Sequence, residues 1–434
     1  MKKTVILTLF LLPMGVAWGQ TGFSARSMGM AGAYQGMSRG AEVSLWNPAN
    51  LALPDGPQMS IDLLGVAMNL GNNSFSLSLY NDYFSENYFD EHESWDEAAK
   101  NTIIGEIPSG GLKVYNRLQI TSLAFSYEQY ALALNTFCYA DGQLPQDLLE
   151  VPLQGLGTEP VNLTDIEGEA IFGTEIVLSG SRMLHPDWDW LEYLTVGASF
   201  KYFIGHAYAT LDEAGGVIIS NPDTIAVNGN YKAFLVAPFD DKGKTGRGVG
   251  LDLGSAAKIN EKLTVGLSIH NFFGSIHFDG AEEYLGSFAF NEKGLNQDEF
   301  DNFGYYLDSV AVDNDTSFAS GEDLSYALPK SFTLSGTYRL NPKITVEADY
   351  QQGLNNTAGG TTTPRLAAGA EARFLSSLPI RFGFALGGIQ GTTLAFGFGL
   401  DLKAYQLDFG FAYQRGLFYG SKGINFALSQ RITL

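Results

Sequence analysis

The sequence predicts an all-β protein, a transmembrane antiparallel β-barrel of about 14 strands. Aromatic residues make up 13% of the chain, glycine occurs 51 times in 434 residues, and charged residues make up only 17%. Many short segments alternate apolar with polar or small residues. The connections between these segments alternate between long and short, as they do in outer-membrane barrels. A sandwich exposed to solvent on its outer faces has no reason to keep that parity.

Alternation within the strands follows from the two environments of a membrane wall. Every backbone N–H and C=O group must be paired inside the bilayer, so the strands must close on themselves. One phase of each strand then faces lipid, and the other, small or polar phase faces the lumen. The segment 394–401 shows this pattern, with Leu394, Phe396, Phe398 and Leu400 alternating with Ala395, Gly397, Gly399 and Asp401.

The first 19 residues have the pattern of a secretory signal peptide. Lys2 and Lys3 precede an apolar run, and small residues flank Trp18, so we expect cleavage before Gln20 and export in a Gram-negative cell. Loss of the two lysines takes the formal charge from -21 to -23. Nucleic acid is excluded as a partner, because phosphate binding needs a basic face.

Residues 20–57 are rich in small side chains and too poor in apolar area to form a domain. Two stretches stand out, the run from Arg26 to Ala33 and the turn Trp46-Asn47-Pro48-Ala49. Small residues allow backbones to approach closely, and Asn-Pro marks a turn. The segment is therefore expected to pack tightly inside or against another structure.

Together these two stretches resemble the N-terminal hatch of FadL-like outer-membrane barrels. They also resemble the start of the related PorV-type barrels of the type IX secretion system. The resemblance implies that residues 20–57 plug the lumen of a barrel formed by residues 58–434, with the Asn-Pro-Ala turn inside the plug. The positions that match the motif are Arg26, Gly29, Gly32, Trp46, Asn47, Pro48 and Ala49.

The wall strands are expected in order along the chain. The first alternating stretch runs from Met59 to Asp82 and is interrupted at 69–73, and an acidic segment follows it to about Asn116. Long loops are expected at about 140–167, 207–245 and 274–328. The remaining strands are expected near 117–127, 130–139, 169–183, 192–206, 247–258, 263–273, 330–340, 343–353, 365–375, 379–388, 392–402, 405–414 and 423–434.

The interruption at 69–73 decides the strand count. If it is a turn, the chain has fifteen strands, and if it is a kink inside one long strand, it has fourteen. Bacterial single-chain barrels have even numbers, and the FadL-like resemblance also implies fourteen. The last strand places Phe426, Leu428, Ile432 and Leu434 on one phase. This resembles the C-terminal signal read by the barrel-assembly machinery, although an aromatic residue is usual at the last position.

Catalytic and metal-binding patterns are absent from the sequence, which predicts that the protein is not an enzyme. None of the five histidines (His92, His185, His206, His270 and His277) has a partner at metal-ligand spacing. The glycines of 248–254 lack the strand–turn–helix context of a dinucleotide site. No nucleophile elbow or Ser-His-Asp set is recognisable, and the single cysteine, Cys138, excludes an intramolecular disulfide.

An acidic stretch from Asp313 to Asp323 spaces oxygen ligands as calcium loops do, but lacks their central glycine and final glutamate. We expect a solvated loop there and no cofactor, with loop-bound calcium as the alternative. The acidic loops as a group suggest divalent cations that bridge to lipopolysaccharide in the surrounding outer-membrane lipid.

FadL-like membership implies passive uptake of hydrophobic small molecules, through a pocket near the plug and a lateral gap in the wall. Phe23, Met28, Met30 and Met37 are candidates to line that pocket, although packing against the wall explains the methionines equally well. A PorV-like accessory barrel, which binds secreted proteins or secretion components, is the alternative. A purely structural role is also open, whereas a plug argues against a general porin.

Overall fold

The barrel closes where its first and last strands pair. In the computed structural model, β1 (Met59–Asp62) and β2 (Gly65–Asn72) together form the first strand. On one side this strand pairs with β22 (Gly423–Thr433), and on the other it pairs with β3 (Leu112–Tyr127). The structure describes residues 24–155, 159–221, 224–236, 245–293, 312–313, 316–319 and 323–434. The signal peptide predicted at residues 1–19 lies outside these ranges.

The closed ring has 14 antiparallel strands, which confirms the predicted fold class and strand number. Two wall strands are extended by short pieces, β10 by β11 (Gly274–Phe278) and β16 by β15 (Leu324–Ala327), which pair with each other. The other wall strands are β4 (Tyr130–Leu144), β6 (Glu167–Leu184), β7 (Tyr193–Asn221), β9 (Gly246–Lys258), β10 (Leu263–His270), β16 (Ser331–Asn341), β17 (Ile344–Gly353), β18 (Arg365–Leu375), β19 (Leu378–Gly387), β20 (Thr393–Leu402) and β21 (Tyr405–Gln414).

The predicted alternation of lipid-facing and lumen-facing residues is present in the wall. On β20, Phe396 is 52% exposed, whereas its neighbour Ala395 is 1% exposed. On β21, Asp408 and Ala412 are buried while Phe409 and Phe411 remain partly exposed. No helix among the described residues is long and apolar enough to cross a membrane.

The first strand ends earlier than its alternation predicted. The break in it lies at Leu63 and Leu64, and beyond Asn72 the chain leaves the wall. The Asn72 side chain accepts hydrogen bonds from the backbone of Ser74 and Phe75, which turns the chain, and α3 (Leu77–Tyr83) follows. The expectation of strand up to Asp82 was therefore wrong, because local side-chain capping outweighed the apolar period.

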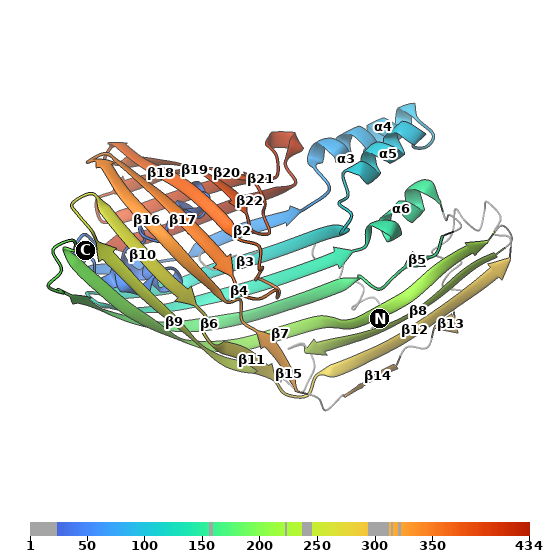
Figure 1. Ribbon diagram of the computed structural model, residues 1–434, viewed down its shortest axis with the longest axis horizontal. Coiled ribbons are helices and arrows are strands. Elements are labelled where there is room, and N and C mark those ends of the chain that lie inside the picture. The colour runs from blue at the N-terminus through green and yellow to red at the C-terminus, as the bar shows by residue number, and fades with distance from the viewer. Residues whose placement is uncertain are drawn as a thin grey trace.

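The two ends of the barrel differ as the loop lengths predicted. Tight turns lie at one end, and the opposite end carries helices above the wall (Figure 1). The acidic segment, for which no secondary structure was predicted, forms α4 (Glu86–Glu91) and α5 (Glu97–Gly105) after α3. A further helix, α6 (Gln146–Gln154), occupies the loop before β6, and the 3-10 helix η4 (Phe418–Gly420) lies between β21 and β22.

A strand extension rises beyond the wall at the helical end. β7 continues well past the predicted end near residue 206 and pairs there with β8 (Thr224–Val236), which in turn pairs with β12 (Glu282–Lys293). The stretches expected to be long loops thus contain strands that the sequence analysis missed. The short strands β5 (Val161–Asn162), β13 (Val312–Asp313) and β14 (Thr316–Ala319) join this extension.

Candidate functional site

Residues 24–53, here called the N-terminal segment, lie inside the barrel and are nearly all buried. The helix α2 (Ala25–Gly29) contacts β19 to β22. On other sides of the ring, the 3-10 helix η2 (Gly40–Leu45) contacts β1, β3, β4 and β6, and η3 (Pro48–Ala52) contacts β6, β7 and β9. Since β7 and β20 lie seven strands apart in the ring of 14, the segment contacts opposite sides of the wall.

Small side chains allow this close fit. A Cβ atom added to Gly29 would lie 2.8 Å from the Cα of Gly397 on β20, so the two glycines let the backbones touch. Gly32 adopts a φ of +83°, a left-handed conformation that favours glycine. Alanines continue the contact in one buried cluster, which consists of Ala31, Ala33, Ala367, Ala385, Ala395 and Ala412.

The Asn-Pro-Ala turn begins η3 and attaches it to the wall. The Asn47 side chain caps the helix by accepting a hydrogen bond from the Ala49 backbone at 3.0 Å, and Pro48 occupies the first turn. The side-chain amide nitrogen of Asn47 donates to the Ser255 carbonyl on β9 at 3.0 Å. Gly197 faces the turn, and a side chain at this position would collide with the backbone of Pro48 and Ala49.

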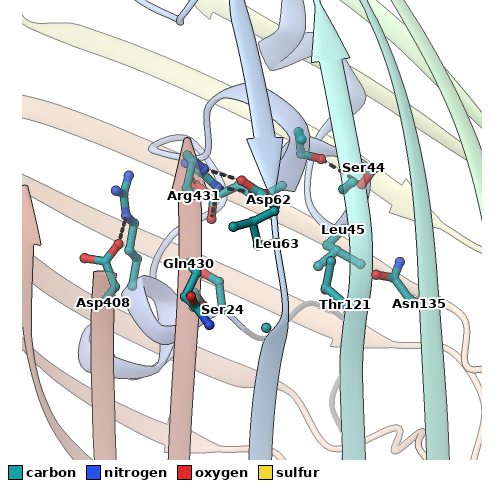
Figure 2. A pocket seen from close by; sticks show the side chains of 16 residues that line it. Ser24, Ser44, Leu45, Asp62, Leu63, Thr121, Asn135, Asp408, Gln430 and Arg431 are labelled. Atoms are coloured by element: carbon teal, nitrogen blue, oxygen red, sulfur yellow. Dashed lines mark hydrogen bonds and ion pairs between the residues drawn. The ribbon is translucent and has the colours of Figure 1, made fainter. Parts of the chain in front are cut away.

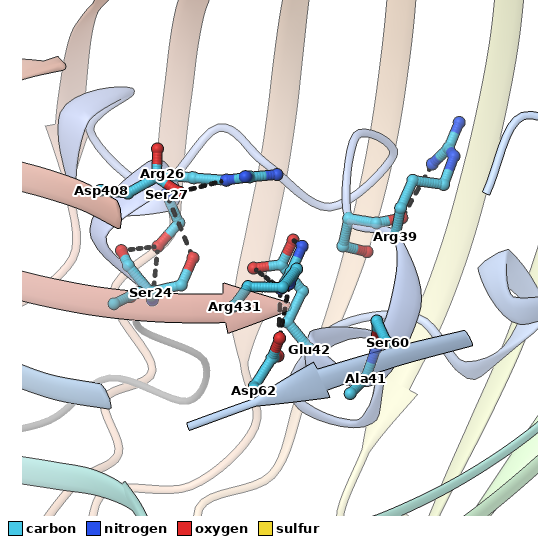
Figure 3. Close-up of polar contacts among 12 residues, drawn as sticks. Ser24, Arg26, Ser27, Arg39, Ala41, Glu42, Ser60, Asp62, Asp408 and Arg431 are labelled. Atoms are coloured by element: carbon cyan, nitrogen blue, oxygen red, sulfur yellow. Dashed lines mark hydrogen bonds and ion pairs between the residues drawn. The ribbon is translucent and has the colours of Figure 1, made fainter. Parts of the chain in front are cut away.

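Two buried ion-pair networks attach the segment to C-terminal strands of the wall (Figure 3). Arg26 donates to Asp408 at 2.7 Å, and Asp408 also accepts from Arg381 at 2.7 Å. Elsewhere in the segment, Glu42 accepts from Arg431 at 3.0 Å. Burial opposes ionisation of Glu42, but the guanidinium groups of Arg431 and Arg26 outweigh it and lower the pKa of this carboxyl.

A small pocket lies between these two networks. Its volume is about 30 Å³, and it is lined by Arg26 and Glu42 from the segment and by Leu63, Thr121 and Asn135 from the wall, among others (Figure 2). Leu63 belongs to the break in the first strand, where one ladder hydrogen bond, from its N–H to the Gln430 carbonyl, remains. β3 has a register shift next to Thr121. The pocket therefore borders an irregular part of the wall, between the break in the first strand and the register shift of β3.

Three further cavities follow one another from the helical end toward the segment. The largest, here called the mouth cavity, has a volume of about 630 Å³. The next, of about 40 Å³, shares five lining residues with it. The third, of about 20 Å³, shares Pro329 with the second and reaches Leu45 of the segment. Beside them the lumen is filled by a buried, mainly aromatic cluster that includes Phe137, Tyr139, Phe203, Tyr208, Phe278 and Tyr326.

A buried Asp-His-Ser chain that the sequence analysis did not find lies on the inner wall. His270 lies 3.2 Å from Asp252 through Nδ1 and 3.0 Å from the Ser268 hydroxyl through Nε2. Ser268 is fully buried, and Gln35 of the segment donates a hydrogen bond to it. Lys201 also pairs with Asp252, at 2.8 Å. The chain thus fastens the segment to β10, and no substrate can reach the serine in this arrangement.

Comparisons with known proteins agree with this geometry. The Family of unknown function (DUF5723) matches residues 48–412. The chain belongs to this family. No curated protein matches the sequence.

Solved structures show the fold that this DUF5723 chain shares. It is similar to the toluene transporter TbuX of Ralstonia pickettii, with a TM-score of 0.51, 16% identity, and coverage of 95% of this chain and 99% of the other. The monoaromatic hydrocarbon channel CymD has a TM-score of 0.51 and 16% identity, and the match covers 96% of this chain and 99% of CymD. The toluene transporter TodX of P. putida has a TM-score of 0.52 and 12% identity, and the match covers 95% of this chain and 99% of TodX. These likenesses show that the chain shares the barrel fold of these three proteins.

The predicted motif residues of this DUF5723 chain come together only in part. Arg26, Gly29 and Gly32 contact β18 to β21, whereas Asn47, Pro48 and Ala49 contact β7 and β9. The side chain of Trp46 packs edge-on against Tyr34, with ring centroids 5.8 Å apart. The family match begins at Pro48, so it includes Pro48 and Ala49 but neither Trp46 nor Asn47.

The candidate pocket residues are packed into the fold. Met28 packs with Ala25, Ala67 and Ala427, and Met30 packs with Tyr34, Leu45 and Trp46, with Met37 against that group. None of the three lines the four cavities described above. Phe23 lies outside the described residues. Their role in binding a ligand remains a prediction.

In the described part of the chain, no three His, Cys, Asp or Glu side chains are grouped so that they could hold a metal ion. In the predicted calcium stretch from Asp313 to Asp323, residues 314–315 and 320–322 lie outside the described residues. Loop-bound calcium therefore remains a prediction.

Proposed function

We propose that this protein is an outer-membrane channel for the passive uptake of small hydrophobic molecules, and that residues 20–57 plug its lumen. The pocket between the N-terminal segment and the break in the first strand carries the proposal. It places a cavity beside the break at Leu63 and Leu64, where the pairing of the first strand with β22 is interrupted between β1 and β2. A molecule held there lies next to the one part of this strand through which it can pass sideways into the bilayer.

The cavities at the helical end support the same function. The mouth cavity falls in the size range of about 300–1,000 Å³ that suits small-molecule ligands, at about 630 Å³. The aromatic cluster below it offers an apolar surface along the lumen. A segment that spans the lumen excludes the free passage of ions. TbuX, a toluene transporter, and CymD, a monoaromatic hydrocarbon channel, are proteins of the same fold with such a role.

Reconstitution into liposomes tests the proposal. We expect the purified barrel to admit toluene faster than empty liposomes do, without a matching ion conductance. Thr121→Trp should fill the pocket and slow uptake at least tenfold. The matched control is Leu123→Trp on the same strand, because Leu123 is 51% exposed toward lipid and should leave uptake unchanged. Toluene entry equal to that of empty liposomes, or a large open ion conductance, would overturn the proposal.

A second candidate is a PorV-like accessory barrel that binds secreted proteins or secretion components. The extension formed by β7, β8 and β12 favours it, because these strands provide a surface beyond the wall at the helical end. Co-purification of secretion components with the full chain, lost when the extension is shortened, would favour this function over uptake. Barrel-assembly machinery, lipopolysaccharide and surrounding lipid are the partners that we propose for either function.

A further inference from the structure

The connection between β17 and β18, residues 354–364, leaves the wall and crosses the lumen. We call these residues the strap. The Thr357 hydroxyl and the Ala358 N–H both donate to Glu169 of β6, at 3.1 and 2.5 Å. In the ring of 14 strands, β6 is followed by β7, β9, β10, β16, β17 and β18. The strap therefore starts on one side of the wall and is held on the far side.

The tip of the strap, from Thr357 to Gly360, is a compact turn on a narrow neck. The Gly360 N–H donates to the Thr357 carbonyl at 2.7 Å, and Gly359 adopts a φ of +95°, a left-handed conformation that favours glycine. Asn356 closes the neck, because its side chain accepts from the backbone and the hydroxyl of Thr362 at 2.8 and 3.1 Å. The tip can therefore move as one unit.

Hydrogen bonds, and little apolar packing, hold the tip in the lumen. Besides the two bonds to Glu169, the Gly359 N–H donates to Asp141 of β4 at 3.3 Å, and the Ala358 carbonyl accepts from the Tyr326 hydroxyl. Ala358 is 1% exposed and is the one tip residue in the buried aromatic cluster. Segments with so few buried apolar contacts are those that open locally while the rest of the fold stays intact.

Glu169 is the main attachment of the tip. Its Oε2 atom accepts both bonds from the strap, and its Oε1 atom accepts from the Tyr208 hydroxyl at 2.9 Å. Hydrogen bonds to an ionised acceptor are stronger than those between neutral groups. Loss of the charge at this one position should therefore weaken the attachment more than loss of any single donor.

The strap lies between the mouth cavity and the second cavity. Three of the five lining residues that these cavities share, Gly360, Thr361 and Thr363, belong to the strap. Glu169 lines the mouth cavity, whereas Ser331 of β16 lines only the second. The third cavity lies beyond the second, next to the N-terminal segment. A solute in the mouth cavity thus meets the strap before it reaches the segment.

We propose that the strap is a gate of the lumen and that the Glu169 carboxylate is its latch. With the hydrogen bonds to Glu169 made, the tip closes the way from the mouth cavity to the two inner cavities. When they break, the tip moves on its neck into the mouth cavity, where a volume of about 630 Å³ is available. This gate is separate from the N-terminal segment and acts on any solute of the mouth cavity, so the inference goes beyond the proposed uptake function.

Thiol accessibility in the detergent-purified full chain tests the gate. Cys138→Ser removes the only cysteine of the chain, and Ser331→Cys then places a thiol behind the strap. We expect this thiol to react with 2-sulfonatoethyl methanethiosulfonate, a water-soluble anion, at least tenfold more slowly than Lys113→Cys in the mouth cavity. Addition of Glu169→Gln should speed the reaction of Ser331→Cys at least fivefold and leave that of Lys113→Cys unchanged.

Matched variants separate the latch from a general loss of structure. Glu167→Gln removes a carboxylate of the same strand and the same cavity that has no hydrogen bond to the described strap residues, and it should leave the Ser331→Cys rate unchanged. Thr357→Val removes one donor to Glu169 and should raise the rate about twofold, which keeps the test valid if Glu169→Gln fails to fold. Thr363→Val, at an exposed strap position, should have no effect.

Either of two results would overturn the inference. One is a Ser331→Cys thiol that reacts as fast as the Lys113→Cys thiol, and the other is a Ser331→Cys rate that neither Glu169→Gln nor Thr357→Val changes. Toluene uptake into liposomes decides the proposed function separately. Normal toluene uptake with an unchanged thiol rate refutes the gate alone, whereas absence of toluene uptake with a thiol rate that depends on Glu169 refutes the channel alone.

Discussion

Arg26 and Asp408 lie 382 positions apart in the chain, yet their side chains meet at 2.7 Å inside the barrel. Arg26 belongs to the N-terminal segment, and Asp408 lies on β21. Asp408 is 2% exposed and is shared with Arg381 of the neighbouring wall, so one carboxylate balances two guanidinium groups. The position of the segment is thus determined by charge as well as by packing.

Removal of that carboxylate should release the segment. Asp408→Asn leaves the buried Arg26 without its counter-ion and Arg381 with Glu371 alone, and breaking a buried pair costs about 3–5 kcal/mol. We expect a lower thermal unfolding temperature in detergent and faster tryptic cleavage after Arg26 and Arg39.

The matched control for this variant is Asp55→Asn. Asp55 pairs with Arg39, but its side chain is 47% exposed, and exposed pairs contribute about 0–1 kcal/mol. Equal effects of the two substitutions would contradict an electrostatic attachment of the segment.

Close backbone contact predicts that Gly29→Ala is destabilising. The added methyl group would lie 2.8 Å from the Cα of Gly397, with no flexible side chain to move aside. Overpacking of this kind costs about 1–3 kcal/mol. Gly105→Ala in α5 is the control, because no atom lies within 4 Å of the position its Cβ would occupy. Thermal unfolding of both variants in one detergent checks the prediction, and an unchanged Gly29→Ala protein would refute the contact.

Loss of the η3 cap should weaken the attachment of η3 to the wall. Asn47→Ala removes the acceptor for the Ala49 N–H and the donor to Ser255. A lost cap costs about 1 kcal/mol, and the second hydrogen bond adds to it. Hydrogen exchange should become faster at residues 48–53, whereas Asn101→Ala on the exposed face of α5 should leave exchange there unchanged. Slow exchange at these residues in Asn47→Ala would show that the turn is held by packing alone.

Acid should weaken the attachment made by Glu42. Burial opposes its ionisation, but Arg431 and Arg26 lower its pKa below the ordinary value. A carboxyl with a lowered folded-state pKa stabilises the protein above the pKa of the unfolded chain, roughly 4.3. That contribution is lost as the pH falls through the lower, folded value.

The Glu42→Gln variant checks this sign. Wild-type protein should unfold at a higher temperature than the variant at pH 7, and the gap should narrow as the pH falls below about 4. A gap that stays constant over this range would mean that Glu42 does not stabilise the segment as an ionised group.

Wall strands and their turns could be predicted from the sequence, because they depend on local patterns. The alternation of Phe396 and Phe398 with Ala395 and Gly397 repeats every two residues, which is the period of a strand between lipid and lumen. The alternation of long and tight connections then set both the parity and the number of strands. The Trp46-Asn47-Pro48-Ala49 turn was also visible, since its capping and its fixed proline angle are properties of neighbouring residues.

Other parts of the chain could not be predicted, because interactions other than the alternating pattern decide their conformation. Asn72 and Ser76 turn and cap the chain, so the apolar phase that continues through Leu77 and Leu79 belongs to a helix and its start. The continuation of β7 lies beyond the wall, as do its partner β8 and the next strand, β12. No lipid contact imposes an alternating pattern on these strands. Without that constraint, polar strands and loops have similar compositions.

By itself, the sequence determined the barrel, its strand phases and the small-residue N-terminal segment, because periodicity and turn chemistry act over a few residues. Only the tertiary structure decided which buried charges meet. Arg117, Lys330 and Arg365 come from three separate parts of the chain and line one cavity, and Arg26 of α2 pairs with Asp408 of the adjacent β21. Such contacts arise when the ring closes, and no local pattern encodes which inward-facing residues will then face each other.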